Sequence, residues 1–292
     1  MSSWTIGIIG GSGLYDIAEL EEREWLSVES PFGSPSDRLL AGRIGEVRFV
    51  FLPRHGRGHV IAPSQVNYRA NVDALKRAGC TDLLAISSVG SLREELAPGN
   101  FVVPDQFIDR TFAREKSFFG AGLVAHVSMA DPVCSRLSGM VVEAARAAGA
   151  AVSEGGTYLA MEGPQFSTRA ESALYRSWGC DIIGMTAMPE AKLAREAELP
   201  YALVGMVTDY DCWRAETAHV EVSQVIAQLG ANAGLARKMV LELARRLPAQ
   251  REASPIDTVL DHALLSDPSA AGAEALERLG AICGRVMAAR KG

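Results

Sequence analysis

Residues 48–90 read RFVFLPRHGRGHVIAPSQVNYRANVDALKRAGCTDLLAISSVG and contain a strand, a helix and a second strand in succession. The apolar runs at 48–53 and 83–89 each have the length of a buried strand. Between them, residues 64–79 are predicted as a helix with its serine as N-cap and its glycine as the end. This order of elements predicts an α/β fold with a largely buried sheet.

The same alternation continues along the chain. Strands are predicted at 6–9, 158–161, 181–185 and 201–207, and helices at 133–148, 168–178, 189–198 and 222–247. The composition changes at 248–255, where prolines flank a polar stretch, and a helical pattern follows at 256–290. We therefore expect one domain over residues 1–247, and a linker with a C-terminal helical extension over residues 248–292.

Composition and charge exclude several classes of protein. Hydrophobic residues make up 48% of the 292 residues, which is enough for a sizeable core, and the net charge is −6. An acidic chain without a basic run argues against nucleic acid or an anionic membrane as the main partner. The five cysteines show no C-x-x-C spacing and are expected to be reduced. The first apolar run is predicted to be a core strand rather than a signal peptide, so we expect a cytoplasmic protein.

Polar residues follow the predicted strands, where ligands bind in α/β sheets. The first strand ends in GGSG at 10–13, whose backbone N–H groups and Ser12 hydroxyl suit an anion, although a plain tight turn has the same composition. The next ends in RHGRGH at 54–59, in which Arg54 and His55 suit phosphate unless the loop is simply solvated. Ser87 and Ser88 lie at the end of a third strand, the one predicted at 83–89. Together these strand ends are expected to converge on one tetrahedral oxyanion.

The strand at 201–207 is followed by TDYDCW at 208–213, which contains Asp209 and Asp211. The two acids are compatible with a metal pair, with surface aspartates or with recognition of a purine. A metal pair lacks a histidine or third acid nearby in the sequence. For a purine, an ionised carboxylate accepts from an exocyclic amine, and a protonated one donates to a ring nitrogen. Burial raises the pKa of a carboxyl group enough to keep it protonated.

Seven motifs resemble those of the trimeric purine-nucleoside phosphorylases, in that family's order. They are GGSG (10–13), RHGR (54–57), GSLREE (90–95), DQFIDRT (105–111), MEGPQFS (161–167), GMTAMPE (184–190) and TDYDCW (208–213). The last is similar to the branch that acts on S-methyl-5′-thioadenosine. The resemblance implies that family's single-domain fold, a mixed and mostly parallel sheet flanked by helices, and a homotrimer with active sites at subunit interfaces.

The resemblance also implies a reaction. It is phosphorolysis of S-methyl-5′-thioadenosine to adenine and 5-methylthio-D-ribose 1-phosphate, a step of purine and methionine salvage. Inorganic phosphate is the second substrate, and no metal or organic cofactor is expected. The residues implied to bind phosphate are Ser12, Arg54, His55, Ser87, Ser88 and Thr186.

The residues implied to bind the nucleoside are Phe166, Ser167, Met185, Asp209, Asp211, Val222, His126 and His59. Asp209 is expected at N7 of the purine as general acid, and Asp211 at the 6-amino group. Phe166 is expected to stack on the base and Met185 to lie beside the ribose, although both are also compatible with core positions. Val222 is expected at the methylthio group. His126 is expected to reach a neighbouring subunit's site unless it is a surface-turn histidine.

Other activities remain open at this stage. The same site chemistry fits 5′-deoxyadenosine or other purine nucleosides, including methylthioinosine, although two carboxyl groups suit adenine better than a 6-oxo base. A non-catalytic nucleoside-binding module would be expected to lack the phosphate residues, yet Arg54, His55 and Thr186 are present. A nucleoside hydrolase would be expected to rely on carboxylates and to turn over without phosphate.

Overall fold

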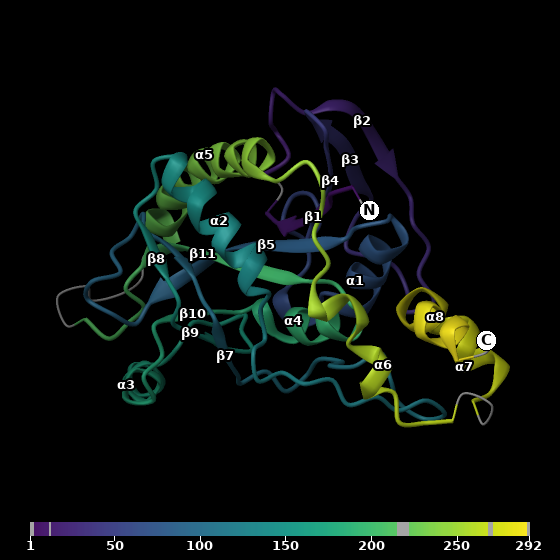
Figure 1. Cartoon of the computed structure of the whole chain (residues 1–292). Helices are drawn as coiled ribbons and strands as arrows, with labels where there is room; N and C mark the ends of the chain where they lie inside the picture. Colours follow the sequence, from purple (N-terminus) through teal and green to yellow (C-terminus); the bar gives the residue numbers. More distant parts are fainter. Residues whose placement is uncertain (1–2, 12, 215–221, 268–270, 291–292) are drawn as a thin grey trace.

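The computed structural model describes residues 3–11, 13–214, 222–267 and 271–290, and a mixed sheet runs through its centre (Figure 1). Its eleven strands are β1 (Thr5–Gly10), β2 (Glu21–Leu26), β3 (Leu39–Ile44), β4 (Val47–Pro53), β5 (Asp82–Ser91), β6 (Phe101–Val103), β7 (Gln106–Asp109), β8 (Val152–Glu154), β9 (Thr157–Ala160), β10 (Ile182–Gly184) and β11 (Tyr201–Asp209). The main path is β2-β3-β4-β1-β5-β10-β9-β7, with β11 pairing β5 and β6, and β8 pairing β6.

Six strand pairings are parallel and four are antiparallel, which confirms the expected mixed and mostly parallel sheet. The parallel pairs are β1–β4, β1–β5, β5–β11, β6–β8, β7–β9 and β9–β10. The antiparallel pairs are β5–β10, β6–β11, β2–β3 and β3–β4. Because β1, β4, β5 and β11 run parallel, their carboxyl ends meet at one edge of the sheet.

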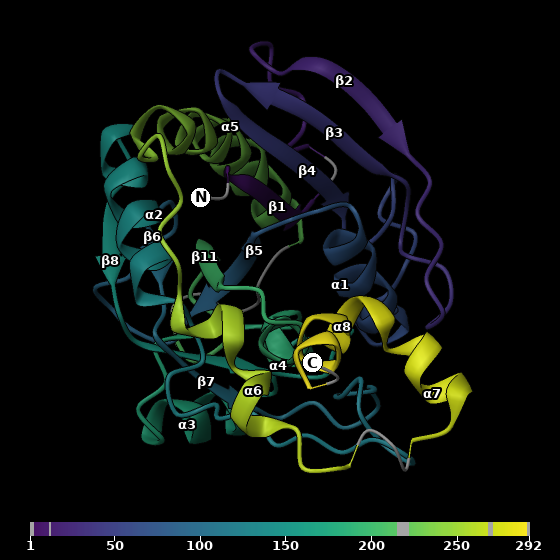
Figure 2. The same cartoon turned by 45° about the vertical axis from the view of Figure 1, so that its right-hand side comes forward.

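Helices cover both faces of the sheet (Figures 1 and 2). The α-helices are α1 (Tyr68–Arg77), α2 (Ser135–Ala147), α3 (Arg169–Ser177), α4 (Ala187–Glu196), α5 (Val222–Arg246), α6 (Leu260–Ala263), α7 (Ala273–Arg278) and α8 (Gly280–Ala289), and two short 3₁₀ helices are η1 (Pro63–Gln65) and η2 (Pro255–Thr258). In both views α2 and α5 lie together on one side, and α1, α4 and α8 on the other. None of the helices in the described ranges is long and apolar enough to cross a bilayer.

The side chains of β5 show how the two faces are filled. Leu83, Ala85 and Val89 belong to the core that contains α1, α4 and α8. Leu84 and Ile86 belong to the core that contains α2 and α5. Successive side chains of a strand point to opposite faces, so a strand covered on both sides is apolar at every position. This is why the continuous run at 83–86 correctly predicted a central strand.

The predicted helix at 64–79 begins later than expected. Asn67 is the N-cap of α1, because its side chain accepts a hydrogen bond from the Ala70 N–H at 3.1 Å. Ser64, the predicted N-cap, lies in η1, and its hydroxyl donates to the Glu162 side chain instead. The helix ends as predicted, before Gly79, whose φ of +84° is the left-handed conformation that favours glycine.

The described part of the segment 248–292 packs against the rest of the chain through ion pairs to buried acids. Arg251 has a side chain only 5% exposed and donates to Asp82 and Asp257. Arg285 of α8 pairs with Glu198 at 2.6 Å. Residues 248–255 therefore carry a buried structural contact in addition to connecting α5 with the C-terminal helices. The boundary at 247/248 remains a prediction.

Glu196, at the end of α4, gives the fold an unusual dependence on pH. Its two carboxylate oxygens accept hydrogen bonds from the Ser117 hydroxyl and the Phe118 N–H, each at 2.7 Å. Burial nevertheless raises its pKa to about 7 from the ordinary 4.5. The folded state therefore keeps a proton that the unfolded chain releases. This contribution to stability is complete below the unfolded pKa and is lost as pH rises through the folded pKa.

We expect Glu196→Gln to remove this dependence, because glutamine stays neutral, its oxygen accepts from the Phe118 N–H, and its amide N–H donates to the Ser117 hydroxyl. Urea unfolding at pH 5, 6, 7 and 8 should show the variant gaining stability relative to wild type as pH rises. Glu143→Gln is the control, since the Glu143 side chain is 64% exposed. A constant difference between Glu196→Gln and wild type across this range would contradict the assignment.

Candidate active site

A cavity of about 820 Å³ opens at the carboxyl edge of β1, β4, β5 and β11. It brings together most of the residues predicted for phosphate and nucleoside. They are Arg54, His55, His59, Ser87, Ser88, Phe166, Met185, Thr186, Asp209 and Asp211. These residues come from segments far apart in the sequence, so the predicted convergence of strand ends on one site is present in the fold.

Four predicted residues are not among those that line the cavity. Ser12 and the side chain of Val222, the first residue of α5, lie outside the described residues. Ser167 is buried beside the cavity, where its hydroxyl donates to the Met161 sulfur at 3.7 Å. His126 is exposed, and its backbone N–H donates to the Ala263 carbonyl.

Arg54 is buried and held from behind by Glu190. Its Nε donates to Glu190 Oε2 at 2.8 Å, and its Nη2 donates to Glu190 Oε1 at 3.1 Å and to the Ile9 carbonyl at 3.2 Å. Glu190 also accepts from the Tyr201 hydroxyl at 3.0 Å. The hydrogen bonds among the described residues thus use Nε and Nη2 and leave the Nη1 donors for a ligand. The guanidinium is fixed in orientation before any anion binds.

Hydroxyl groups lie beside this arginine. The Ser87 and Thr186 oxygens are 3.2 Å apart, and both residues are buried. Thr186 precedes α4, but the backbone is extended at Met188 (φ −118°, ψ 134°), so Thr186 offers its hydroxyl rather than the N-terminus of a continuous helix. Arg57, in the same basic loop, turns away and forms a two-point pair with Asp37. The loop therefore contributes one arginine, Arg54, to the cavity and another, Arg57, to an ion pair at the surface.

His55 lines the cavity, and its hydrogen bond fixes which ring nitrogen carries the proton. Its Nδ1 lies 2.8 Å from the Ile61 carbonyl and therefore carries the proton, because a carbonyl only accepts. Burial and the nearby Arg54 lower its pKa to about 4. The ring is therefore neutral near pH 7, and its Nε2 presents a lone pair. His59 stacks on it with ring centroids 4.4 Å apart. His55 is suited to accept a hydrogen bond from a hydroxyl or from a protonated phosphate oxygen.

Asp209 and Asp211 lie together at the end of β11. Asp209 Oδ1 accepts from the Asp211 N–H at 2.8 Å, and Oδ2 lies 2.7 Å from the Thr208 hydroxyl. Asp211 is 5% exposed, and its Oδ2 has no hydrogen-bond partner among the described residues. Burial raises the pKa of both carboxyl groups. A Cβ on Gly90 would lie 3.1 Å from Asp209 Oδ1, so glycine there lets the acids approach β5.

The Thr208 hydroxyl is a hydrogen-bond partner for Asp209 in either protonation state of the carboxyl group. The Thr208 hydroxyl lies 2.7 Å from Asp209 Oδ2 and 3.2 Å from the Val89 carbonyl oxygen. It has one hydrogen and can donate to only one of them at a time. When it donates to Val89, its lone pairs accept a hydrogen bond from a protonated Asp209. The site therefore accommodates both protonation states of Asp209 without moving the carboxyl group.

The two residues left open between ligand and core positions are both on the cavity. Phe166 is 53% exposed, which excludes the core position, and Met185 is partly exposed. Sequence reasoning did not assign a role to Glu190, although it closes the GMTAMPE motif. An acidic residue in an otherwise apolar helical turn indicates a buried acid with a partner, and this pattern could have identified Glu190. Within the described ranges, no cluster of three or more His, Cys, Asp or Glu residues is placed to hold a metal ion.

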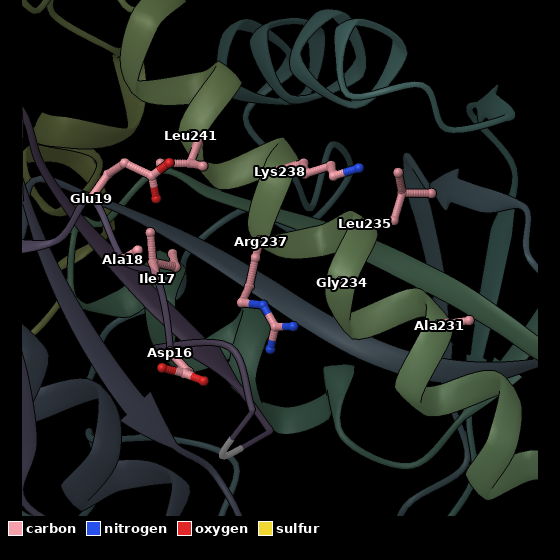
Figure 3. Close-up of a pocket in the computed structure, with 10 residues that line it drawn as sticks. All are labelled: Asp16, Ile17, Ala18, Glu19, Ala231, Gly234, Leu235, Arg237, Lys238 and Leu241. Carbon is pink, nitrogen blue, oxygen red and sulfur yellow. The ribbon is translucent and has the colours of Figure 1, made fainter.

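A second cavity of about 570 Å³ lies between residues 16–19 and α5 (Figure 3). Its charged side chains are Asp16, Glu19, Arg237 and Lys238. Arg237 extends from α5 and donates to the Gly13 carbonyl at 2.9 Å. Gly13 also lines the first cavity, so this arginine supports the glycine loop from its outer side. We place the candidate active site in the first cavity, where the buried cation and the paired acids lie.

Residues 5–245 match the Phosphorylase superfamily. The S-methyl-5′-thioadenosine phosphorylase of Cereibacter sphaeroides is 60% identical over 284 residues, which cover 97% of this chain and 98% of the relative. The enzyme of that name from Rhodospirillum rubrum is 56% identical and covers 97% of each chain. Since so much of the chain is covered, these relatives share most of the segment 248–292.

Solved structures with similar folds agree with these relatives. A methylthioadenosine phosphorylase from an antarctic soil metagenomic library superposes with a TM-score of 0.92 at 44% identity, covering 97% of this chain and 99% of that one. The methylthioadenosine phosphorylase of Schistosoma mansoni in complex with adenine gives a TM-score of 0.83 at 40% identity, covering 89% and 98% of the two chains.

Proposed function

The chain belongs to the phosphorylase superfamily, and on that premise we propose that it cleaves S-methyl-5′-thioadenosine with inorganic phosphate. The products are adenine and 5-methylthio-D-ribose 1-phosphate, so the enzyme is a pentosyltransferase. One observation carries the proposal beyond the family. A single cavity joins a buried arginine and hydroxyl groups, which suit phosphate, to a half-buried and a buried acid of raised pKa, which suit adenine.

Phosphate is assigned to the Arg54 side of the cavity. We propose that Arg54 Nη1 and the hydroxyl groups of Ser87, Ser88 and Thr186 donate to its oxygens, with Ser12 as a further donor. Neutral His55 accepts a hydrogen bond from a protonated oxygen of phosphate or from a hydroxyl of the sugar. Because Glu190 already fixes the orientation of Arg54, little side-chain conformational entropy is lost when phosphate binds. Phosphate is the second substrate, and no organic cofactor or metal is proposed.

Adenine is assigned to the acids. As the glycosidic bond breaks, negative charge develops on the purine and positive charge on the sugar. Asp209, which burial favours in its protonated form, gives its proton to N7 and so stabilises the leaving base. Asp211 Oδ2, which lacks a partner, accepts from the 6-amino group. The phosphate anion stabilises the cationic sugar from the opposite face and then adds to its anomeric carbon.

The sugar and the 5′ group complete the assignment. Phe166 is proposed to stack on the base, and Met185 to lie beside the ribose, with Ser167 and His59 nearby. Val222, as an apolar residue at the start of α5, is proposed for the methylthio group. We also propose a homotrimer in which His126, exposed in the single chain, reaches the site of a neighbour. A cytoplasmic location is supported by the five free cysteines.

Release of adenine from S-methyl-5′-thioadenosine, measured with and without inorganic phosphate, tests this function. Release that depends strictly on phosphate, with formation of the methylthioribose phosphate, is the expected result. Equal release without phosphate would assign a hydrolase instead. If no adenine is released in either condition, while methylthioinosine is cleaved, the interpretation of the acid pair is wrong.

Asp211→Ala is expected to lower kcat/KM for adenine nucleosides more than for 6-oxo nucleosides. A 6-oxo base has an acceptor where adenine has its amine, so only adenine loses a hydrogen bond in the variant. A hydrogen bond to a charged group is worth about 1.5–3 kcal/mol, or roughly 10–150-fold in kcat/KM. Methylthioadenosine and methylthioinosine are compared in one assay, with Asp16→Ala as control. Equal losses on both nucleosides would remove Asp211 from the 6-amino group.

A further inference from the structure

Arg114 lies between β7 and α2, outside the cavity lining, and its side chain is 1% exposed. Its guanidinium donates to four backbone carbonyls. Nη1 donates to Met185 and Met188, the latter at 2.7 Å, and Nη2 donates to Glu162 at 2.6 Å and Met161 at 3.5 Å. Arg114 therefore joins the segment that follows β9 to the segment that follows β10.

Both segments form walls of the cavity. Met161 and Phe166 line it from the first segment, and Met185 and Thr186 from the second. The walls also touch directly, because a Cβ on Gly163 would come within 2.5 Å of the Met185 sulfur. Buried carbonyls outside helices and ladders need donors, and here one planar group serves both walls. The spacing of the walls thus depends on the shape of a single guanidinium.

Glu162 extends the same contact to a third wall. Its carboxylate accepts from Arg114 Nε at 3.3 Å and from the Phe112 N–H at 2.6 Å, and it also accepts from the Ser64 hydroxyl. Ser64 belongs to η1, and the other two residues of η1, Pro63 and Gln65, line the cavity. Arg54 donates to Glu190 and Ile9 rather than to any member of this group of contacts.

We propose that Arg114 is a positioning residue for the nucleoside: without touching it, Arg114 sets the separation of the Met161–Phe166 wall from the Met185 side of the cavity, between which sugar and base bind. This rests on the proposed function for the identity of the ligand. It predicts that nucleoside binding depends on the guanidinium shape, whereas phosphate binding, through Arg54, depends on it far less. A purely structural arginine would affect stability without this distinction.

The test compares Arg114→Lys with Arg251→Lys. Lysine keeps the charge but is a point donor that cannot serve both walls. Arg251 is a matched control, because it is also buried and paired but holds the C-terminal segment. Calorimetry measures the Kd of S-methyl-5′-thioadenosine and of inorganic phosphate separately, so no turnover is needed. Glu162→Gln, which keeps the carbonyl contacts of Arg114, serves as the second variant if Arg114→Lys does not fold.

We expect Arg114→Lys to raise the nucleoside Kd at least about tenfold and the phosphate Kd by less than about threefold, as a small misplacement of a binding wall would do. Glu162→Gln should shift the nucleoside Kd in the same direction by a smaller factor. Arg251→Lys should change neither. Equal rises in both Kd values, or a nucleoside Kd unchanged in both variants, would overturn the positioning role. Normal nucleoside binding by wild type without phosphorolysis would instead refute only the proposed function.

Discussion

Replacing Asp209 with alanine is expected to lower kcat for S-methyl-5′-thioadenosine by about 10²–10⁴-fold, the usual contribution of a general acid. Burial raises the pKa of this carboxyl group, which favours its protonated form relative to an exposed aspartate. The Asp211 N–H and the Thr208 hydroxyl fix both of its oxygens. The carboxyl group is therefore held in place, and transfer of its proton to N7 lets the purine leave as a neutral base rather than as an anion.

A nucleoside methylated at N7 separates this chemical role from simple binding. Its base is already cationic and leaves as a neutral molecule without a proton. Asp209→Ala should therefore lose much less activity on N7-methylated methylthioadenosine than on the parent nucleoside, measured as kcat in single-turnover experiments. Asp211→Ala is the matched control, since its loss should be similar on both substrates. If Asp209→Ala loses the same factor on both, Asp209 is not the acid.

The parts of this site that the sequence predicted are those that depend on local order along the chain. Arg54, Ser87 and Asp209 were located because parallel strands end at one edge of a sheet, whatever the details of packing. The central strand was recognised because burial on both faces makes every position of its first part, residues 83–86, apolar. By contrast, β2 reads EEREWL and is exposed along most of its length, so it has no such run.

What was missed depends on partners distant in sequence. Ser64 has the composition of an N-cap, but its hydroxyl is used by Glu162, 98 positions away, while Asn67 caps the helix. The pairing of Arg54 with Glu190 spans 136 positions. Arg114 looks like a surface arginine in a polar stretch. Its role becomes visible only when the fold brings the β9 and β10 loops together. Such contacts have no periodicity and no spacing rule to reveal them.

Replacement of Arg54 is expected to have the second large effect, on the KM for phosphate. The ion pair of Arg54 with Glu190 determines how the experiment must be designed. Loss of the Nη1 donors removes charged hydrogen bonds worth about 1.5–3 kcal/mol each, so Arg54→Ala should raise the KM for phosphate by roughly 10²–10⁴-fold. The same change leaves Glu190 buried without its cation, which typically costs about 3–5 kcal/mol of stability. A weak enzyme and a poorly folded one would then look alike.

The double variant Arg54→Met with Glu190→Gln resolves these two effects. Glutamine keeps an acceptor for the Tyr201 hydroxyl, and methionine fills the volume of the arginine stem, so no charge is left unpaired. Urea unfolding should show most of the lost stability restored, while the KM for phosphate stays as high as in Arg54→Ala. Arg57→Met, in the same loop but paired with Asp37, should leave the KM for phosphate unchanged. Recovery of phosphate affinity in the double variant would mean that Arg54 supports the fold and that another group binds the anion.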